Sequence, residues 1–222
     1  MTKTGEAARP PRDLDTDSLL DTIRARRREI TIGVIALAAI GGTFYVWRES
    51  VLKKEENAER ALNTAANSYY SGNKALAQSD LERMVVRYGD TSAGVQGAML
   101  LAQILYEGGK WPEGIAKLEA AAARSSGRRF SAALQGLIAT GFADQQKYDD
   151  AAKHYLRASD EAPFPADKDL YRADAARILM LAGKQDDARK IWAALASKLD
   201  SPVLGEAKIR LGELSVVPPA KN

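Results

Sequence analysis

The 222-residue sequence contains no cysteine and only one histidine, His154. Without cysteine the chain forms no disulfide bond and performs no thiol chemistry, so an oxidising compartment would not harm it. One histidine without cysteine also leaves no recognisable set of zinc ligands. His154 stands next to an expected packing position, which favours a surface or rim side chain. We therefore expect no metal site and no cofactor.

A large excess of charge is missing too, because 32 Lys and Arg face 29 Asp and Glu, for a net charge of +3. This balance does not favour nucleic acid as a partner. No phosphate-binding loop, nucleophile elbow or dinucleotide fingerprint is present. Two acidic pairs, Asp149-Asp150 and Asp186-Asp187, recur just inside expected helices, where they complement the helix N-terminus. We expect neither an enzyme nor a small-molecule substrate.

One long run, Ile30 to Trp47, has no charged residue. A helix of this length covers roughly 27 Å, close to the thickness of a bilayer's hydrocarbon core. Phe44, Tyr45 and Trp47 gather at its far end, where an aromatic belt would lie. A buried core helix and a cleaved signal peptide are the alternatives. The long preceding arm and the lack of a small-residue cleavage site favour a retained transmembrane helix over 30–47.

Arginines flank the N-terminal side of this run. Positive charge next to a membrane span marks its cytoplasmic side, and the same side chains can contact anionic lipid headgroups. The pattern predicts a single-pass protein with a cytoplasmic arm over residues 1–29 and the lipid bilayer as a partner. The residues expected to set this topology are Arg24, Arg26, Arg27 and Arg28.

After the run, residues 48–60 are charged and free of Gly and Pro, which predicts a helical linker. Residues 61–214 are rich in Ala and Leu with helical periodicity and no convincing strand run. Stepping by 37 residues aligns four segments of this part without a gap. The most regular columns are Ala65, Ala102, Ala139 and Ala176; Ala77, Gly114, Ala151 and Ala188; Leu81, Leu118, Tyr155 and Trp192; and Met84, Ala121, Ala158 and Leu195.

These columns have a physical reason. Small residues are needed where two antiparallel helices cross closely, and larger ones fill the space between neighbouring hairpins. Turn sequences stand between the columns, at Gly72, Gly109, Gln146 and Gly183, and glycine there supplies a left-handed helix cap. The pattern predicts an all-α right-handed solenoid of about four helical hairpins, a capping helix over Pro202 to Leu214, and a disordered tail over 215–222.

The hairpins resemble the tetratricopeptide repeat, which is normally 34 residues long. The third unit carries the resemblance best, with Lys147-Tyr148-Asp149-Asp150-Ala151-Ala152 followed by Tyr155 and Ala158. The first unit is degenerate, since it lacks the usual aromatic residue after its turn. The three additional residues per period imply longer loops between the hairpins.

The order of arm, span and repeats is similar to the YfgM-like family of membrane-anchored tetratricopeptide proteins, which are ancillary subunits of the Sec translocon. The most specific stretch is GKQDDARKIWAALASKLDSPVLGEAKIRLGEL, residues 183–214. The resemblance implies a bacterial inner-membrane scaffold whose periplasmic domain links the translocon to a membrane-anchored periplasmic chaperone. The alternative is a structural accessory subunit of another large membrane complex, docked through its span and helix faces.

In repeats of this kind the first helix of each hairpin lines the concave face. The face expected here has one arginine and no asparagine, too few to bind a C-terminal carboxylate, and it suits a hydrophobic or helical segment. For the Met and Leu positions, packing against the neighbouring hairpin is the alternative. The expected groove residues are Tyr69, Gln96, Met99, Gln103, Tyr106, Thr140, Arg177 and Met180. The same face also includes Glu59, Leu62, Ala66, Ala133, Gly136, Ala143, Leu170 and Ala173.

Overall fold

Helices account for nearly all of the chain that the computed structural model describes, residues 27–215, and this part contains no β-strand. The predicted disordered tail beyond Ser215, most of the predicted arm, and Arg24 and Arg26 lie outside the described residues. The elements are α2 (Arg27–Tyr70), α3 (Lys74–Tyr88), α4 (Ser92–Glu107), α5 (Trp111–Ala122), the 3₁₀ helix η1 (Ser125–Phe130), α6 (Ser131–Asp144), α7 (Tyr148–Glu161), α8 (Pro165–Leu181), α9 (Gln185–Ala196) and α10 (Leu204–Ser215).

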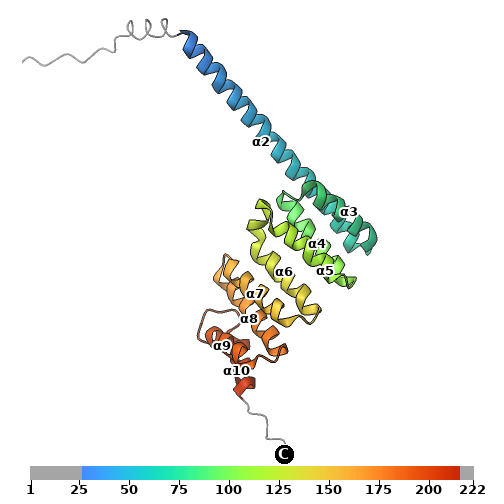
Figure 1. Ribbon diagram of the computed structural model, residues 1–222, viewed down its shortest axis with the longest axis vertical. Helices are drawn as coiled ribbons and strands as arrows, with labels where there is room; N and C mark the ends of the chain where they lie inside the picture. The colour runs from blue at the N-terminus through green and yellow to red at the C-terminus, as the bar shows by residue number, and fades with distance from the viewer. Residues whose placement is uncertain (1–26, 216–222) are drawn as a thin grey trace, which may run out of the picture. The chain divides into compact units, whose positions relative to one another are not determined.

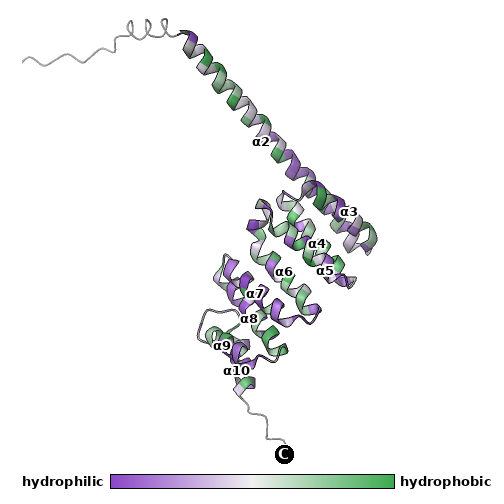
Figure 2. Ribbon diagram, in the orientation of Figure 1, coloured by the Kyte–Doolittle hydropathy of each residue, from purple (hydrophilic) through white to green (hydrophobic). Residues whose placement is uncertain are grey.

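The described chain divides into two compact units between Leu52 and Lys53. In the first unit, the N-terminal part of α2 is mainly hydrophobic, and the section that follows is hydrophilic (Figure 2). By length and composition this helix can cross a membrane, and none of its apolar window is buried in the structure. Of the flanking arginines, Arg27 begins the helix and the side chain of Arg28 is exposed.

The second unit, from Lys53 onward, is a stack of helical hairpins in chain order, which Figure 1 shows from α3 to α10. The end of α2 pairs with α3 through Ala58 and Ala65, which pack against Ala77 and Leu81. Further along, α4 pairs with α5, α6 with α7 and α8 with α9, and α10 follows as a single last helix. The prediction of an all-α tetratricopeptide-like solenoid with a capping helix is confirmed.

The columns of the 37-residue repeat lie in the core of this stack. All four residues of the first alanine column, Ala65, Ala102, Ala139 and Ala176, have no exposed surface. Three of the large residues in the aromatic and leucine column are equally buried: Leu81, Leu118 and Trp192. The fourth, Tyr155, is half-buried. Small residues therefore let the paired helices approach while the large ones fill the gaps beside them.

The four hairpin turns share one conformation. Their central residues have positive φ, at +87° in Gly72, +74° in Gly109, +60° in Gln146 and +75° in Gly183. In each turn the next backbone N–H donates to the carbonyl five residues earlier, as in Asn73 to Ser68 at 2.9 Å. This is the hydrogen-bond pattern of a Schellman cap, which satisfies carbonyls that the helix end would leave unpaired.

The expected longer loops between hairpins are only partly present. Residues 89–91 alone join α3 to α4, and residues 162–164 alone join α7 to α8. Here the additional residues extend helices, since α3, α4 and α8 are 15, 16 and 17 residues long. Among the helices described between residues 27 and 215, the longer connections are 123–130, which holds η1, and 197–203.

A carboxylate of α2 joins the first hairpin to the second. Glu55 accepts hydrogen bonds from the backbone N–H groups of Ser92, at 3.2 Å, and Ala93, at 3.0 Å, in the first turn of α4. Lys54 forms a salt bridge with Asp90 at 2.6 Å in the preceding connection. The Glu55 hydrogen bonds satisfy backbone donors that have no partner within the helix, and the Glu55 carboxylate places negative charge at its N-terminus.

Candidate protein-binding groove

A cavity of about 330 Å³ opens between helices α4, α6, α7 and α8. Met99 and Leu137 supply its larger apolar side chains, and Ala133 and Gly136 leave room between them. We call this cavity the groove. Its lining is Met99, Ala133, Gly136, Leu137, Thr140, Tyr155, Tyr171 and Asp174.

Hydroxyl groups supply part of the groove's polar surface. The Thr140 hydroxyl donates to the Gly136 carbonyl at 3.1 Å and lies 3.1 Å from the Tyr155 hydroxyl. Burial raises the pKa of the Tyr155 phenol, and burial also raises the pKa of Tyr171. Both phenols are therefore protonated and neutral near pH 7, so each can donate or accept a hydrogen bond.

Asp174 brings a carboxylate to the groove, and Arg177 compensates it. Burial raises the pKa of Asp174, while the positive charge of Arg177 acts in the opposite direction. Arg177 also donates to Glu206 of α10, through Nε at 2.8 Å and a terminal nitrogen at 2.5 Å. Hydrogen bonds from Arg177 are the main cause of the lowered pKa of Glu206. Because two carboxylates share this one guanidinium, it is not free to bind a ligand's C-terminal carboxylate.

The structure brings some of the predicted groove residues together. Met99 and Thr140 line the groove, as do the smaller Ala133 and Gly136. Arg177 does not line it but forms a salt bridge with Asp174, which does. Tyr69 and Gln103 instead form a separate polar cluster, in which Gln103 donates to the Tyr69 hydroxyl at 3.3 Å.

The separate cluster is centred on Glu107 of α4. Tyr69 donates to one carboxylate oxygen of Glu107, and Lys74 pairs with the other at 2.7 Å. The hydrogen bond with Lys74 is the largest cause of the lowered pKa of Glu107, and the bond to Glu107 is the largest cause of the raised pKa of Tyr69. Gln96, another predicted groove residue, is outside the groove lining and is exposed one turn before Met99 on α4.

Tyr106 and Met180 point into the packing between helices. The Tyr106 hydroxyl donates to the Leu137 carbonyl at 3.1 Å, and its ring fills the space beside Gly114 and Gly141. The Met180 sulfur accepts from the indole N–H of Trp192 at 3.4 Å. The contacts of Met180 therefore favour the alternative prediction, in which this side chain packs against a neighbouring helix and does not line the groove.

Sequence reasoning did not include four residues that line the groove: Leu137, Tyr155, Tyr171 and Asp174. Tyr155 was assigned to the packing column, where its half-buried ring also belongs. On α8, counting from the alanine column predicts Leu170 and Ala173 as groove residues. Ala173 is instead fully buried, and the residues that follow these two, Tyr171 and Asp174, line the groove. The sequence signal for these two positions is an acidic residue, Asp174, one helical turn after an aromatic one, Tyr171.

His154 lies on α7, away from the groove lining. Its Nδ1 is 2.7 Å from Oε1 of Gln135, and its ring stacks on Phe142 with centroids 5.2 Å apart. Burial lowers the pKa of the imidazole, and the nearby Arg157 adds to this effect. The side chain is half-buried, as expected of a rim histidine. Within residues 27–215, no three His, Asp or Glu side chains are grouped as a metal site would require.

Comparison with known proteins agrees with the architecture. A family model described as a tetratricopeptide repeat-like domain matches residues 26–214. A crystal structure of nearly identical TPR-like repeats from a kinesin light chain of Podosopora anserina has a TM-score of 0.54 at 14% identity, covering 72% of this chain and 86% of that one. A single-residue variant of it gives 0.53 at 16% identity, covering 72% and 85%. Curated protein sequences give no match.

Proposed function

The chain belongs to the family of tetratricopeptide repeat-like domains, and we propose that it is a membrane-anchored scaffold whose groove binds a segment of another protein. Solenoids of this family typically act as non-catalytic interaction scaffolds. The observation that carries the proposal is the groove itself, an open cavity with an apolar floor and hydroxyls at its side.

The lining of the groove defines the segment that would fit it. Met99 and Leu137 offer adaptable apolar contact, which favours a bulky aliphatic or aromatic side chain. The Asp174 carboxylate and the Tyr155 and Tyr171 hydroxyls can accept hydrogen bonds from a neighbouring donor. A segment with an apolar residue next to an amide, hydroxyl or basic group therefore suits the groove better than a free C-terminal carboxylate.

The proposed setting is the bacterial inner membrane, with the N-terminus in the cytoplasm and the repeats in the periplasm. There the protein would be an ancillary subunit of the Sec translocon that holds a membrane-anchored periplasmic chaperone nearby. Support comes from the candidate membrane helix, from the arginines before it and from the resemblance to the YfgM-like family. Anchoring in one membrane raises the effective concentration of a weak site for partners in that membrane.

Site-specific photocrosslinking in intact cells tests this proposal. A photoreactive residue at Met99 should capture a chaperone or a translocating chain, whereas one at Glu119, exposed on α5 and outside the groove lining, should not. Equal capture from both positions would contradict a specific groove.

The second candidate, a structural accessory subunit, is favoured by the exposed apolar surface of α2. A shallow notch on this helix is lined by Ala39, Ile40, Thr43, Phe44 and Trp47. Capture of a partner from Ile40 together with no capture from Met99 would favour this alternative.

The orientation is testable by itself. A reporter that fluoresces only in the cytoplasm, fused after Asn222, should remain dark. Replacing Arg27 and Arg28 with glutamine should raise the fraction of fluorescent, inverted molecules, since these charges help set the topology. A bright fusion of the unmodified chain would refute the proposed orientation.

A further inference from the structure

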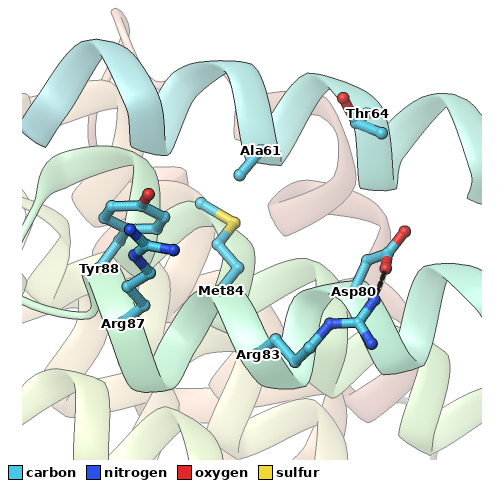
Figure 3. Close-up of a pocket in the computed structure, with 7 residues that line it drawn as sticks. All are labelled: Ala61, Thr64, Asp80, Arg83, Met84, Arg87 and Tyr88. Carbon is cyan, nitrogen blue, oxygen red and sulfur yellow. Dashed lines mark hydrogen bonds and ion pairs between the residues drawn. The ribbon is translucent and has the colours of Figure 1, made fainter.

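A second cleft lies on the first hairpin, away from the groove. Its volume is about 350 Å³, and it is bounded by Ala61 and Thr64 of α2 and by residues of α3. Figure 3 shows Met84 and Ala61 facing one another across its floor, with Arg83 and Arg87 along the α3 side. We call it the first-hairpin cleft. Its lining is Ala61, Thr64, Asp80, Arg83, Met84, Arg87 and Tyr88.

The next hairpin contains the same cleft 37 residues later, and there it is partly filled. Five lining positions correspond, and the remaining space in the second hairpin is only about 150 Å³. The difference arises because Val85 and Gly89, at the C-terminal end of α3, enter it, while Val86 lies largely exposed at its edge. The corresponding pairs are Ala61 and Ala98, Asp80 and Lys117, Arg83 and Ala120, Met84 and Ala121, and Arg87 and Arg124.

An arginine holds the helix end in this filled cleft. Arg124 donates to the backbone carbonyl of Val85 at 3.4 Å. A Cβ atom on Gly89 would lie 1.4 Å from a guanidinium nitrogen of Arg124, so the guanidinium rests directly on the backbone there. Carbonyls at a helix C-terminus have no partner within the helix and carry partial negative charge, which a guanidinium complements.

In the first-hairpin cleft, Arg87 takes the place of Arg124 but has no helix end to hold. Within the described residues it forms no salt bridge, and its guanidinium lies 5.3 Å from the centroid of the Tyr88 ring. Ala61 and Met84 provide an apolar floor beneath it. The charge and the apolar floor that bind the end of α3 in the second hairpin are therefore both available.

The rest of this face excludes a complete additional hairpin. Thr64 stands where the later repeats have Leu101, Ile138 and Ala175, all of them buried. Ser68 likewise replaces Leu105, Phe142 and Leu179. A polar outer face is the mark of a terminal repeat. The cleft thus suits the end of one helix rather than a stacked hairpin, which also argues against continuation of the solenoid by a second copy.

We propose that the first-hairpin cleft binds the C-terminal turn of an α-helix from a partner protein. One small apolar side chain of that helix, in the place of Val85, fills the space over Ala61 and Met84, and a second lies at the edge of the cleft. Arg87 donates to an unpaired carbonyl at its end. This surface is separate from the groove, and the proposal does not depend on what the groove binds.

The probe is a peptide with the sequence of residues 74–90, KALAQSDLERMVVRYGD, capped at both ends. A lactam bridge between Asp80 and a lysine substituted for Leu76 holds it helical on the side away from the two valines. We expect saturable binding to the full chain in detergent micelles, measured by fluorescence anisotropy. Ala61→Trp, which fills the cleft, should abolish binding, and Arg87→Gln should weaken it about tenfold, as loss of a charged hydrogen bond does.

Three controls match these variants. Ala116→Trp places the same side chain at an exposed position of α5 outside the cleft, and it should leave the affinity unchanged. Ala133→Trp, in the groove, should also leave it unchanged, so that failure of the groove and failure of this cleft are distinguishable. A peptide with both valines replaced by asparagine should not bind.

Three results would overturn the proposal. Two of them are absence of saturable binding by the bridged peptide and binding that Ala61→Trp leaves intact. The other is concentration-dependent self-association of the full chain in sedimentation runs that Ala61→Trp abolishes, because the occupant would then be a second copy of this chain.

Discussion

At the scale of single residues, the fold depends most on positions where two helices leave no room. Ala139 is one of the four fully buried alanines at which paired helices cross. Leucine there adds three carbon atoms to a filled space. We expect Ala139→Leu to lower the free energy of unfolding by about 1–3 kcal/mol, measured by denaturant unfolding in detergent. The matched variant Ala120→Leu, at an exposed position of α5, should change it little.

His154 makes stability depend on pH in a defined direction. Because burial lowers its pKa in the folded chain, the unfolded chain binds the proton more readily. Stability is therefore unaffected by this group above about pH 6.5 and falls as the pH drops below that value. As the sequence has no other histidine, the difference from His154→Gln isolates the effect. Parallel unfolding curves for the two proteins between pH 7.5 and 5 would contradict it.

Residue burial could largely be predicted from the sequence, while side-chain direction could not. The alanine columns were assigned from spacing alone, since the helix crossings repeat. Tyr106 and Tyr171 show where the prediction fails. Tyr106 turns inward because Gly114 and Gly141 leave space for its ring, and Tyr171 lines the groove beside Gly136. Both directions depend on glycines in other helices, which a count along one helix does not include.

At the scale of elements, the four turns provide a matched pair of substitutions. Gln146 adopts positive φ, a conformation that costs a residue with a side chain about 1 kcal/mol and that glycine adopts freely. We expect Gln146→Gly to stabilise the chain and Gly109→Gln to destabilise it, each by up to about 1 kcal/mol. Thermal unfolding of both variants measures this. Changes of the same sign in the two proteins would disprove the shared turn conformation.

The N-terminus of α4 gives a second matched pair. Glu55 accepts two backbone hydrogen bonds there, whereas its neighbour Glu56 is exposed and pairs with Arg60. Glu55→Ala should cost about 1–2 kcal/mol of stability, as loss of a helix cap does, and Glu56→Ala less than about 0.5 kcal/mol. Denaturant unfolding distinguishes them, and equal losses would show that the Glu55 contacts contribute nothing.

Helices and turns could be predicted from the repeat because both depend on local sequence and recur every 37 residues. The Glu55 cap could not, since its partners lie 37 and 38 residues away. The length of α8 was also missed: Pro165 starts the helix directly after Phe164, and its 17 residues take up what was expected in a loop. Proline is favoured at a first helical position, so this start had a readable signal.

At the scale of the whole molecule, α2 combines two sections of different composition. The N-terminal part of α2 is apolar enough for a membrane, and its C-terminal part is the first helix of the first hairpin. The order of candidate membrane helix and repeats was predictable from composition and period. The lining of the groove was not, because it combines residues from four helices whose rotation about their own axes the period does not fix.

The most direct test of the proposed scaffold is co-purification of partners with the groove filled. Ala133→Trp places a large side chain in the groove, and Ala116→Trp places the same side chain at an exposed position of α5. Each protein is purified from membranes and its bound proteins are quantified by mass spectrometry. We predict that Ala133→Trp alone loses a translocon-associated or chaperone partner while its membrane insertion and melting temperature are retained. Retention of every partner by a folded Ala133→Trp protein would contradict binding through the groove.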